Sequence, residues 1–282
     1  MINRQRFLLG VVDFLQKHGR STKLDIIKVM FVIAKERPPG FSMYGFYPYK
    51  IGPFSSQIYS DLSFFAAKGI VEEIDKAFTV THEGMKEELL PSGYADYLAQ
   101  LLARYPTVET LIDYVYTNYP EYAMKSERKN VPVKVQLETT PCFFLIGYEG
   151  RTIDDFLNEL IVNNIQILVD VRNNPRSMKY EFNKERLKKA LSQVSIEYIN
   201  IPELGVQHEK RKHLETKDDY ERLFASYAAE LPRKERWLKY LCTIGENKRV
   251  AIMCFEKDYQ SCHRREIGKN LRQYGQDIRI IS

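Results

Sequence analysis

The sequence predicts two domains. The first, residues 1–124, is mostly helical and winged-helix-like; the second, residues 141–282, is an α/β domain with a Rossmann-like parallel sheet. Three short apolar runs, each stopping at glycine or polar residues, carry the α/β prediction. They begin at Phe143, Ile165 and Arg249. Buried runs that alternate with segments of helical periodicity are typical of parallel strands joined by right-handed crossovers. The charged, proline-interrupted stretch 125–140 is the expected linker.

Composition restricts the class of protein. With 282 residues and 44% hydrophobic content, the chain can bury two cores of ordinary size. No apolar run is long enough to cross a membrane, and the N-terminus lacks the form of a signal peptide. Four cysteines do not make a disulfide scaffold, so a cytoplasmic location is expected. The net charge of +5 is compatible with a polyanionic partner, and no cofactor is expected.

The first half divides into three helices and a two-stranded hairpin. Helical spacing and helix-ending glycines or prolines predict helices at 3–18, 22–34 and 56–68, followed by strands at 70–74 and 77–80. Further helices are expected to about residue 123, with breaks at Pro91 and Pro106. The order of three helices and a hairpin resembles a winged-helix fold.

The loop before the third helix, YPYKIGPFSS at residues 47–56, resembles that of phage- and toxin-associated winged-helix-like domains. If the third helix enters a DNA groove, the residues that contact DNA are Ser55, Ser56, Gln57, Tyr59 and Ser60. The helix carries few cations, however, and phosphate contacts dominate DNA affinity. Contact with a protein partner through this domain is therefore the alternative.

The second half alternates strands and helices. After the first apolar run, the pattern predicts a helix capped by Thr152, the strand that ends near Asp170, a basic helix at 184–194 and a strand at 196–201. Helices at 220–227 and 234–245 follow, and then the strand that ends at Cys254. A helix at 262–274 and a strand at 278–281 complete the sheet.

Five sequence blocks in this half resemble the family called domain of unknown function 488. The blocks are GYEGR at 147–151, VDVRNNPRS at 169–177, EYINIPELG at 197–205, MCFEKD at 253–258 and CHRREIG at 262–268. The resemblance covers roughly residues 142–282 and implies no established chemistry. Members of the family often have a second glycine after the Glu-Leu-Gly block, whereas Val206 stands at that position here.

Polar side chains begin where the three apolar runs end. In an open α/β sheet, ligands bind at the carboxyl ends of the strands, so we expect these residues to form one site. The catalytic candidates are Asp170, Glu149 and Arg172. An Asp170 carboxylate beside arginines would stay ionised, and it could orient a water or stabilise an oxocarbenium-like centre. The alternative is a structural Asp–Arg pair that closes a loop.

The candidates for substrate binding surround these residues. They are Tyr148, Gly150, Arg151, Asn173, Pro175, Arg176, Cys254, Glu256, His263 and Arg264. Arginines are forked donors suited to phosphate, whereas Tyr148 could stack on a base and Asn173 could read a base edge. The turn 147–151 leads into a helix N-terminus, which favours an anion. The alternative is a tight turn that requires glycines for backbone reasons.

Cys254, Cys262 and His263 allow a different chemistry. Their spacing is not that of a standard zinc site, so no metal is expected, and a metal site is the less favoured alternative. The VDVR strand and a later strand ending in cysteine also resemble the sulfur-transferring rhodanese domains. The loop after Cys254 is acidic at its start and has no glycine, which argues against a reactive thiolate there. The alternative is a small buried residue at a strand end.

These features favour an enzyme that acts on DNA. The predicted reaction is hydrolysis of the N-glycosidic bond of a base, including a modified base, after the base is flipped out of the stack. The phage-related resemblance of the first domain suggests a role in phage defence. Two alternatives remain: a thiol or sulfur-transfer enzyme that uses Cys254 or Cys262, and a non-catalytic DNA-binding regulator that senses a nucleotide.

Overall fold

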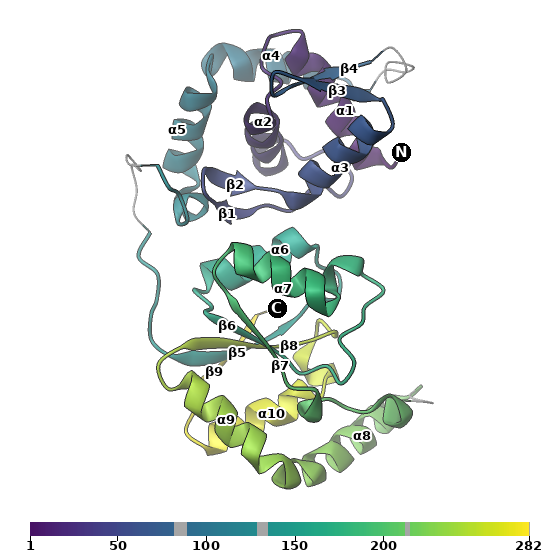
Figure 1. The fold of residues 1–282 in the computed structure, drawn as a ribbon, viewed down its shortest axis with the longest axis vertical. Coiled ribbons are helices and arrows are strands. Elements are labelled where there is room, and N and C mark those ends of the chain that lie inside the picture. Colours follow the sequence, from purple (N-terminus) through teal and green to yellow (C-terminus); the bar gives the residue numbers. More distant parts are fainter. Residues whose placement is uncertain (82–88, 129–134, 212–214, 282) are drawn as a thin grey trace. The chain divides into compact units, whose positions relative to one another are not determined.

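The structure, a computed structural model, describes residues 1–81, 89–128, 135–211 and 215–281. The chain divides into two compact units, Met1–Gln136 and Leu137–Ser282 (Figure 1). Within the described ranges, no helix is both long enough and apolar enough to cross a membrane.

The N-terminal unit is mostly helical, as expected. Its elements are α1 (Asn3–Gln16), α2 (Lys23–Glu36), β1 (Tyr47–Tyr49), β2 (Gly52–Phe54), α3 (Ser56–Ala67), β3 (Val71–Ile74), β4 (Ala77–Val80), α4 (Tyr94–Arg104), α5 (Val108–Asn118) and a 3₁₀ helix at Pro120–Ala123. The helix, helix, helix, hairpin order is present, and its assignment to the winged-helix class remains our interpretation of that order. The segment expected to be a loop before α3 contains the antiparallel pair β1–β2. Residues 82–88, which follow the hairpin in the region where further helices are expected, lie outside the described residues.

Hydroxyl side chains begin α2 and α3. Thr22 Oγ1 accepts a hydrogen bond from the backbone N–H of Asp25, and Ser55 Oγ accepts one from Ile58 at 3.4 Å. Such caps satisfy donors that the first helical turn leaves without a partner. Ser55 is fully buried and serves the cap. It is therefore not available for the DNA contact that the sequence suggested.

The expected linker, 125–140, is attached to a unit at each end. On the N-terminal side, the Glu127 backbone N–H donates to Lys50 O at 2.8 Å, and Arg128 pairs with Asp113. On the C-terminal side, the Glu138 carboxylate pairs with Arg279. Residues 129–134 lie outside the described ranges. The division between the units, after Gln136, falls inside this stretch.

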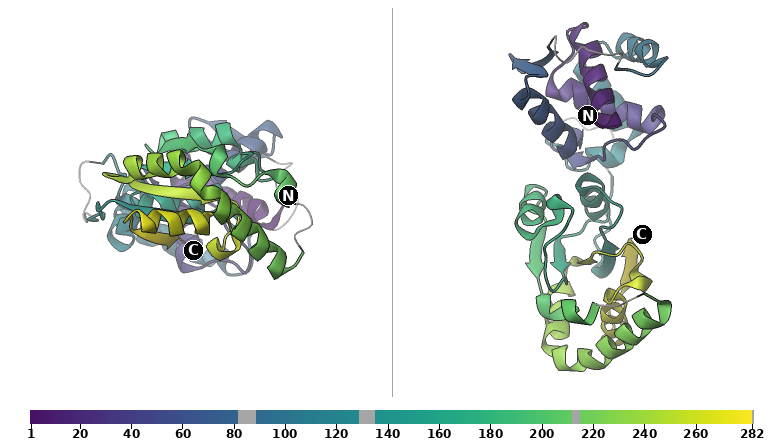
Figure 2. Two further views of the ribbon diagram at one scale, coloured as in Figure 1. Left: turned by 90° about the horizontal axis from the view of Figure 1, so that it is seen from below. Right: turned by 90° about the vertical axis from the view of Figure 1, so that its right-hand side faces the viewer.

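The C-terminal unit is an α/β fold with a five-stranded parallel sheet, as predicted. Its strands are β5 (Cys142–Gly147), β6 (Ile167–Asp170), β7 (Glu197–Asn200), β8 (Arg249–Cys254) and β9 (Ile278–Ile281), in the order β7-β6-β8-β5-β9. Helices α6 (Ile153–Val162) and α7 (Lys184–Gln193) cover one face, and α8 (Lys217–Glu230), α9 (Glu235–Gly245) and α10 (Arg264–Gln273) cover the other (Figures 1 and 2).

The sheet order places β8 between β6 and β5. Gly147 is the register partner of Cys254, and Asp170 is the partner of Met253. The carboxyl ends of the three strands therefore lie side by side. The chain leaves β5 and β6 towards α6 and α7, but it leaves β8 towards α10 on the opposite face. This reversal is a topological switch point, where open α/β sheets form a crevice for ligands.

Alternation along the strands directs neighbouring side chains to opposite faces. Val250, Ile252 and Cys254 of β8 belong to the core beneath α9 and α10, together with Val169 of β6. Asp170, the residue after Val169, therefore points to the α6 and α7 face. Cys254 and Asp170 end adjacent strands, yet their side chains lie on opposite sides of the sheet.

Candidate functional site

A cavity of about 330 Å³ lies at the carboxyl ends of β5, β6 and β8. We call it the strand-end pocket. It is lined by Tyr148, Arg172, Asn173, Asn174, Arg176, Ser177, Met178, Lys179, Val206, Cys254 and Phe255. Five of the residues predicted from the sequence are in this lining: Tyr148, Arg172, Asn173, Arg176 and Cys254. The lining contains cations, amides and hydroxyls but no carboxylate side chain.

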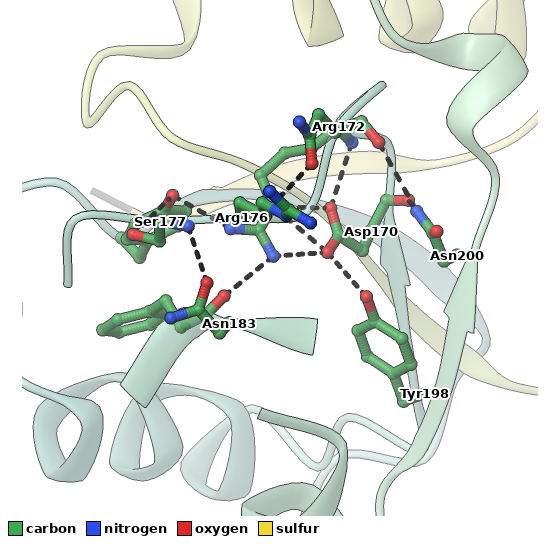
Figure 3. Close-up of polar contacts among 10 residues, drawn as sticks. Asp170, Arg172, Arg176, Ser177, Asn183, Tyr198 and Asn200 are labelled. Atoms are coloured by element: carbon green, nitrogen blue, oxygen red, sulfur yellow. Dashed lines mark hydrogen bonds and ion pairs between the residues drawn. The ribbon is translucent and has the colours of Figure 1, made fainter. Parts of the chain in front are cut away.

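Asp170 is buried beneath this pocket and does not line it. Its side chain is fully buried, and four donor groups point at its carboxylate (Figure 3). Arg172 supplies three of them: its backbone N–H at 3.0 Å, Nε at 2.9 Å and Nη2 at 2.6 Å. Tyr198 supplies the fourth through its hydroxyl at 2.7 Å. A carboxylate with these contacts is a fixed anchor for its neighbours.

The protonation states of this group follow from the same contacts. Burial alone would lower the pKa of the Arg172 guanidinium, but its hydrogen bonds and charge pairing with Asp170 raise the pKa above the usual value. Burial, together with the charge of Asp170, raises the pKa of Tyr198. Tyr198 therefore remains a hydrogen-bond donor over the ordinary pH range. The geometry agrees with the structural Asp–Arg pair that the sequence left open.

Arg172 transmits this anchoring to the pocket wall. Its Nη1 donates to the hydroxyl of Tyr148 at 3.0 Å, and its Nη2 donates to Phe182 O at 3.0 Å. The Tyr148 ring stacks on Phe182, with ring centroids 4.3 Å apart and planes 12° apart, and it meets the edge of Phe255. Because Tyr148 is only 2% exposed, neither ring face is open to a base. Its predicted stacking role does not fit this arrangement.

Phe255 is an aromatic residue that sequence reasoning missed. It lines the strand-end pocket, and 41% of its surface is exposed. A π-face at the pocket rim is suited to stacking on a base. The available signal in the sequence was its place directly after the strand that ends at Cys254. Asn174, Ser177, Met178, Lys179 and Val206 also line the pocket and were not singled out as site residues.

The turn after β5 packs directly against the loop after β8. A Cβ atom on Gly147 would lie 1.8 Å from Glu256 O, so glycine is required for this close approach. Gly150 has φ +75°, which favours glycine for conformational reasons. Glu149 is exposed; its backbone N–H donates to Phe255 O, and its Oε2 accepts from the Lys257 N–H, both at 2.9 Å.

Arg151 and Pro175 do not line the pocket. Arg151 Nε donates back to Gly147 O at 3.1 Å, and its Nη1 lies 3.8 Å from Glu159 of α6. Pro175 O accepts the backbone N–H of Lys184, where α7 begins. Both residues fix the loops that frame the pocket, whereas Arg176 and Lys179 line it.

The loop after β6 is fixed by the Glu-Leu-Gly block. Asn173 Nδ2 donates to Pro202 O at 3.3 Å. A Cβ atom on Gly205 would lie 2.3 Å from Asn173 N, so this glycine permits the approach of the two loops. Val206, which replaces the second glycine of the family pattern, lines the pocket. Arg176 is exposed at the rim, and Lys179 Nζ donates to Arg151 O at 2.8 Å.

Cys254, Cys262 and His263 form a buried group on the α10 side of the sheet. The sulfur of Cys254 lies 3.9 Å from His263 Nδ1, and that of Cys262 lies 3.7 Å from the same nitrogen. Of these three residues, Cys254 alone lines the pocket. Arg264 is fully buried and donates through Nη2 to Lys257 O at 3.0 Å. Glu256, His263 and Arg264, which the sequence predicted to bind substrate, do not line the strand-end pocket.

A second cavity, of about 640 Å³, adjoins the first and shares Asn173 and Val206 with it. Its cationic side chains are Lys210, Arg233, Lys234 and Arg236, and Trp237 is also in its wall. The ammonium of Lys210 pairs with the Glu230 carboxylate, which also lies in this wall. Residues 212–214 of that region lie outside the described ranges.

Comparison with known families matched residues 152–271 to the model described as Domain of unknown function DUF488. The family resemblance seen in the sequence is thereby confirmed for this range. Four of the five sequence blocks lie inside it, and the GYEGR turn directly precedes it. No protein of curated function and no solved structure matched the chain.

Proposed function

We propose that this protein, whose residues 152–271 match the model described as Domain of unknown function DUF488, is an enzyme acting on nucleic acid. The reaction that we propose is hydrolysis of an N-glycosidic bond in DNA. The observation that carries the proposal is the composition of the strand-end pocket: three cationic side chains, two amides and one exposed aromatic ring converge at a topological switch point.

The pocket is suited to a single nucleotide. Its volume of about 330 Å³ lies within the range of small-molecule sites. Arg176 and Lys179 provide positive charge for a phosphate. Asn173 and Asn174 carry both donors and acceptors, which a base edge or a sugar hydroxyl requires. Phe255 supplies the stacking face that we had assigned to Tyr148. A nucleotide inside a duplex would have to be extruded to reach these groups.

The catalytic roles differ from those first expected. Asp170 and Arg172 are positioning residues in this proposal, because the carboxylate is buried and Arg172 connects it to the pocket wall. Glu149 does not line the strand-end pocket, but it follows the lining residue Tyr148 and its backbone N–H donates to Phe255 O, so we assign its exposed carboxylate the activation of water at the pocket rim. One of its oxygens already accepts the Lys257 N–H, which fixes the orientation of the carboxylate.

The test is an abasic-site assay. The full chain is incubated with single-stranded and duplex DNA, unmodified and with modified bases, and abasic sites are detected by alkaline strand cleavage on a gel. We expect cleavage with the wild type, and a loss of roughly 100-fold or more with Glu149→Gln, as removal of a general base costs. Cleavage retained by Glu149→Gln would remove this residue from its role.

Substrate binding needs a separate control. Arg176→Gln should weaken DNA binding, whereas Arg222→Gln, an exposed arginine on α8 that is not in the pocket lining, should not. Saturable nucleotide binding without turnover on any of these substrates would contradict the enzyme proposal. It would favour the non-catalytic regulator instead.

One observation favours thiol chemistry as a second candidate. Cys254 lines the pocket and its sulfur lies 3.9 Å from His263 Nδ1, a pairing that thiol enzymes use. The complete burial of Cys254 opposes a nucleophilic role. Mass spectrometry after incubation with a sulfur donor tests this candidate function. A persulfide on Cys254 would support sulfur transfer, and unmodified thiols on both Cys254 and Cys262 would exclude it.

For the N-terminal unit we propose delivery or regulation of the catalytic unit, through DNA or a protein partner, in a phage-defence setting. The exposed side of α3 includes Ser60 and Phe64, and Phe64 is 44% exposed. This surface has little positive charge for phosphate contact. If DNA binds here, affinity should fall steeply with salt, and Phe64→Ser should leave it unchanged. If a protein binds here, Phe64→Ser should weaken that complex.

A further inference from the structure

The buried group at the start of α10 has the composition of a metal site. Cys254 ends β8, and Cys262 and His263 precede the first turn of α10. One sulfur or nitrogen atom from each residue lies within 4.8 Å of the others. All three side chains are at most 1% exposed. We propose that Cys254, Cys262 and His263 bind a soft divalent metal ion, with Zn²⁺ as the natural ion for this set.

The distances agree with tetrahedral zinc. Zinc binds thiolate sulfur at about 2.3 Å and imidazole nitrogen at about 2.0–2.1 Å, so its ligand atoms lie roughly 3.5–3.8 Å from one another. The two sulfur-to-nitrogen distances here are 3.7 and 3.9 Å. A change of a few tenths of an ångström would bring both sulfur-to-nitrogen distances into this range. Two cysteines and one histidine form a known ligand set for zinc with a fourth position left over.

The surrounding fold fixes these ligands. Gly147 allows the loop after β8 to approach β5, so that 255–261 return the chain to Cys262. The backbone N–H of Cys262 donates to Tyr259 O at 3.2 Å. The Tyr227 ring meets the His263 ring edge to face, with centroids 5.3 Å apart. A rigid setting of this kind favours a preformed site.

Arg264 beside this group has donors without acceptors. Its side chain is fully buried, and within the described part of the chain its Nε and Nη1 have no hydrogen-bond partner. Buried donors without an acceptor are unfavourable. Thiolate sulfurs of a metal site in the same buried group would be acceptors for these donors.

The test uses the full chain, without an affinity tag, reduced and freed of metal by a chelator. Titration with Co²⁺ should produce thiolate-to-cobalt charge-transfer absorption that saturates at one equivalent and is abolished by Zn²⁺. Cys262→Ser and His263→Gln should each reduce affinity by more than the roughly 10- to 100-fold that outer-shell changes cost. Cys142→Ser, a change at a buried cysteine outside the group, is the matched control.

Two results would overturn the inference. The first is a reduced wild type that shows no cobalt absorption, which is informative even if the variants do not fold. The second is oxidation of Cys254 and Cys262 to a disulfide, with loss of two hydrogens in the mass spectrum, in a protein that binds no cobalt when reduced. The inference does not depend on the proposed reaction, because cobalt binding and abasic-site formation are measured separately.

Discussion

Replacement of Asp170 by asparagine should destabilise the C-terminal unit strongly. Asp170→Asn keeps the shape of the side chain but removes the charge that balances the Arg172 guanidinium. The variant also places an amide NH₂ group where Arg172 Nη2 and the Tyr198 hydroxyl now donate, at 2.6 and 2.7 Å. A buried charge would then lack its counter-charge, and two donors would face a donor.

The magnitude follows from the burial of the pair. The side chains of Asp170 and Arg172 are 0% and 6% exposed. Removing one partner of a buried ion pair costs about 3–5 kcal/mol, a large share of the 5–15 kcal/mol that stabilises an ordinary domain. Glu235→Gln is the control, because Glu235 pairs with Lys239 on the exposed side of α9. Its loss should cost about 0–1 kcal/mol.

Urea unfolding followed by tryptophan fluorescence measures both. Trp237, the one tryptophan of the chain, lies on α9 and therefore reports the C-terminal unit. The double variant Asp170→Asn/Arg172→Met removes the buried charge as well, so it should be more stable than Asp170→Asn alone. A cost for Asp170→Asn below about 1 kcal/mol, equal to that of Glu235→Gln, would refute the assignment of this pair as an anchor.

Three further predictions concern other sites. Burial, with repulsion from Arg128, lowers the pKa of Lys28 to about 7. Between pH 7 and 10.5 the unfolded chain therefore binds more protons than the folded chain, so raising the pH from 7 to 9 should stabilise the N-terminal unit by about 2 kcal/mol. In urea titrations followed by circular dichroism, Lys28→Met should flatten this pH dependence. Gly205→Ala should cost about 1–3 kcal/mol in the Trp237 assay, because its Cβ would collide with Asn173. Phe255→Ala should weaken binding of a labelled single-stranded oligonucleotide by about 1–3 kcal/mol in fluorescence anisotropy; unchanged binding would count against stacking at the pocket rim.

The sequence was sufficient to predict the α/β architecture of the second half. Apolar runs of strand length gave β5, β6 and β8, and a general rule about open sheets placed polar residues at their carboxyl ends. The glycines of the GYEGR and Glu-Leu-Gly blocks marked real close approaches: Gly147 contacts the loop after β8, and Gly205 contacts Asn173.

The side of the sheet to which an individual side chain points could not be predicted. The sequence does not contain the sheet order, so it could not show that Asp170 and Cys254, at the ends of adjacent strands, point to opposite faces. Nor could it show that Phe182, distant from the GYEGR block, covers the ring of Tyr148. Long-range contacts of this kind decide which polar residues reach a pocket and which are used to hold the fold.

The position of β8 has a consequence for how the chain reaches its native state. β5 and β6 are synthesised early, but they form no strand pair with each other, because β8 lies between them. Until residues 249–254 leave the ribosome, the two strands expose edges that only β8 can cover. The pocket and the buried cysteine group both require this late strand. Folding of the unit should therefore be slow and should wait for β8, and chains that still lack β8 should bind to chaperones.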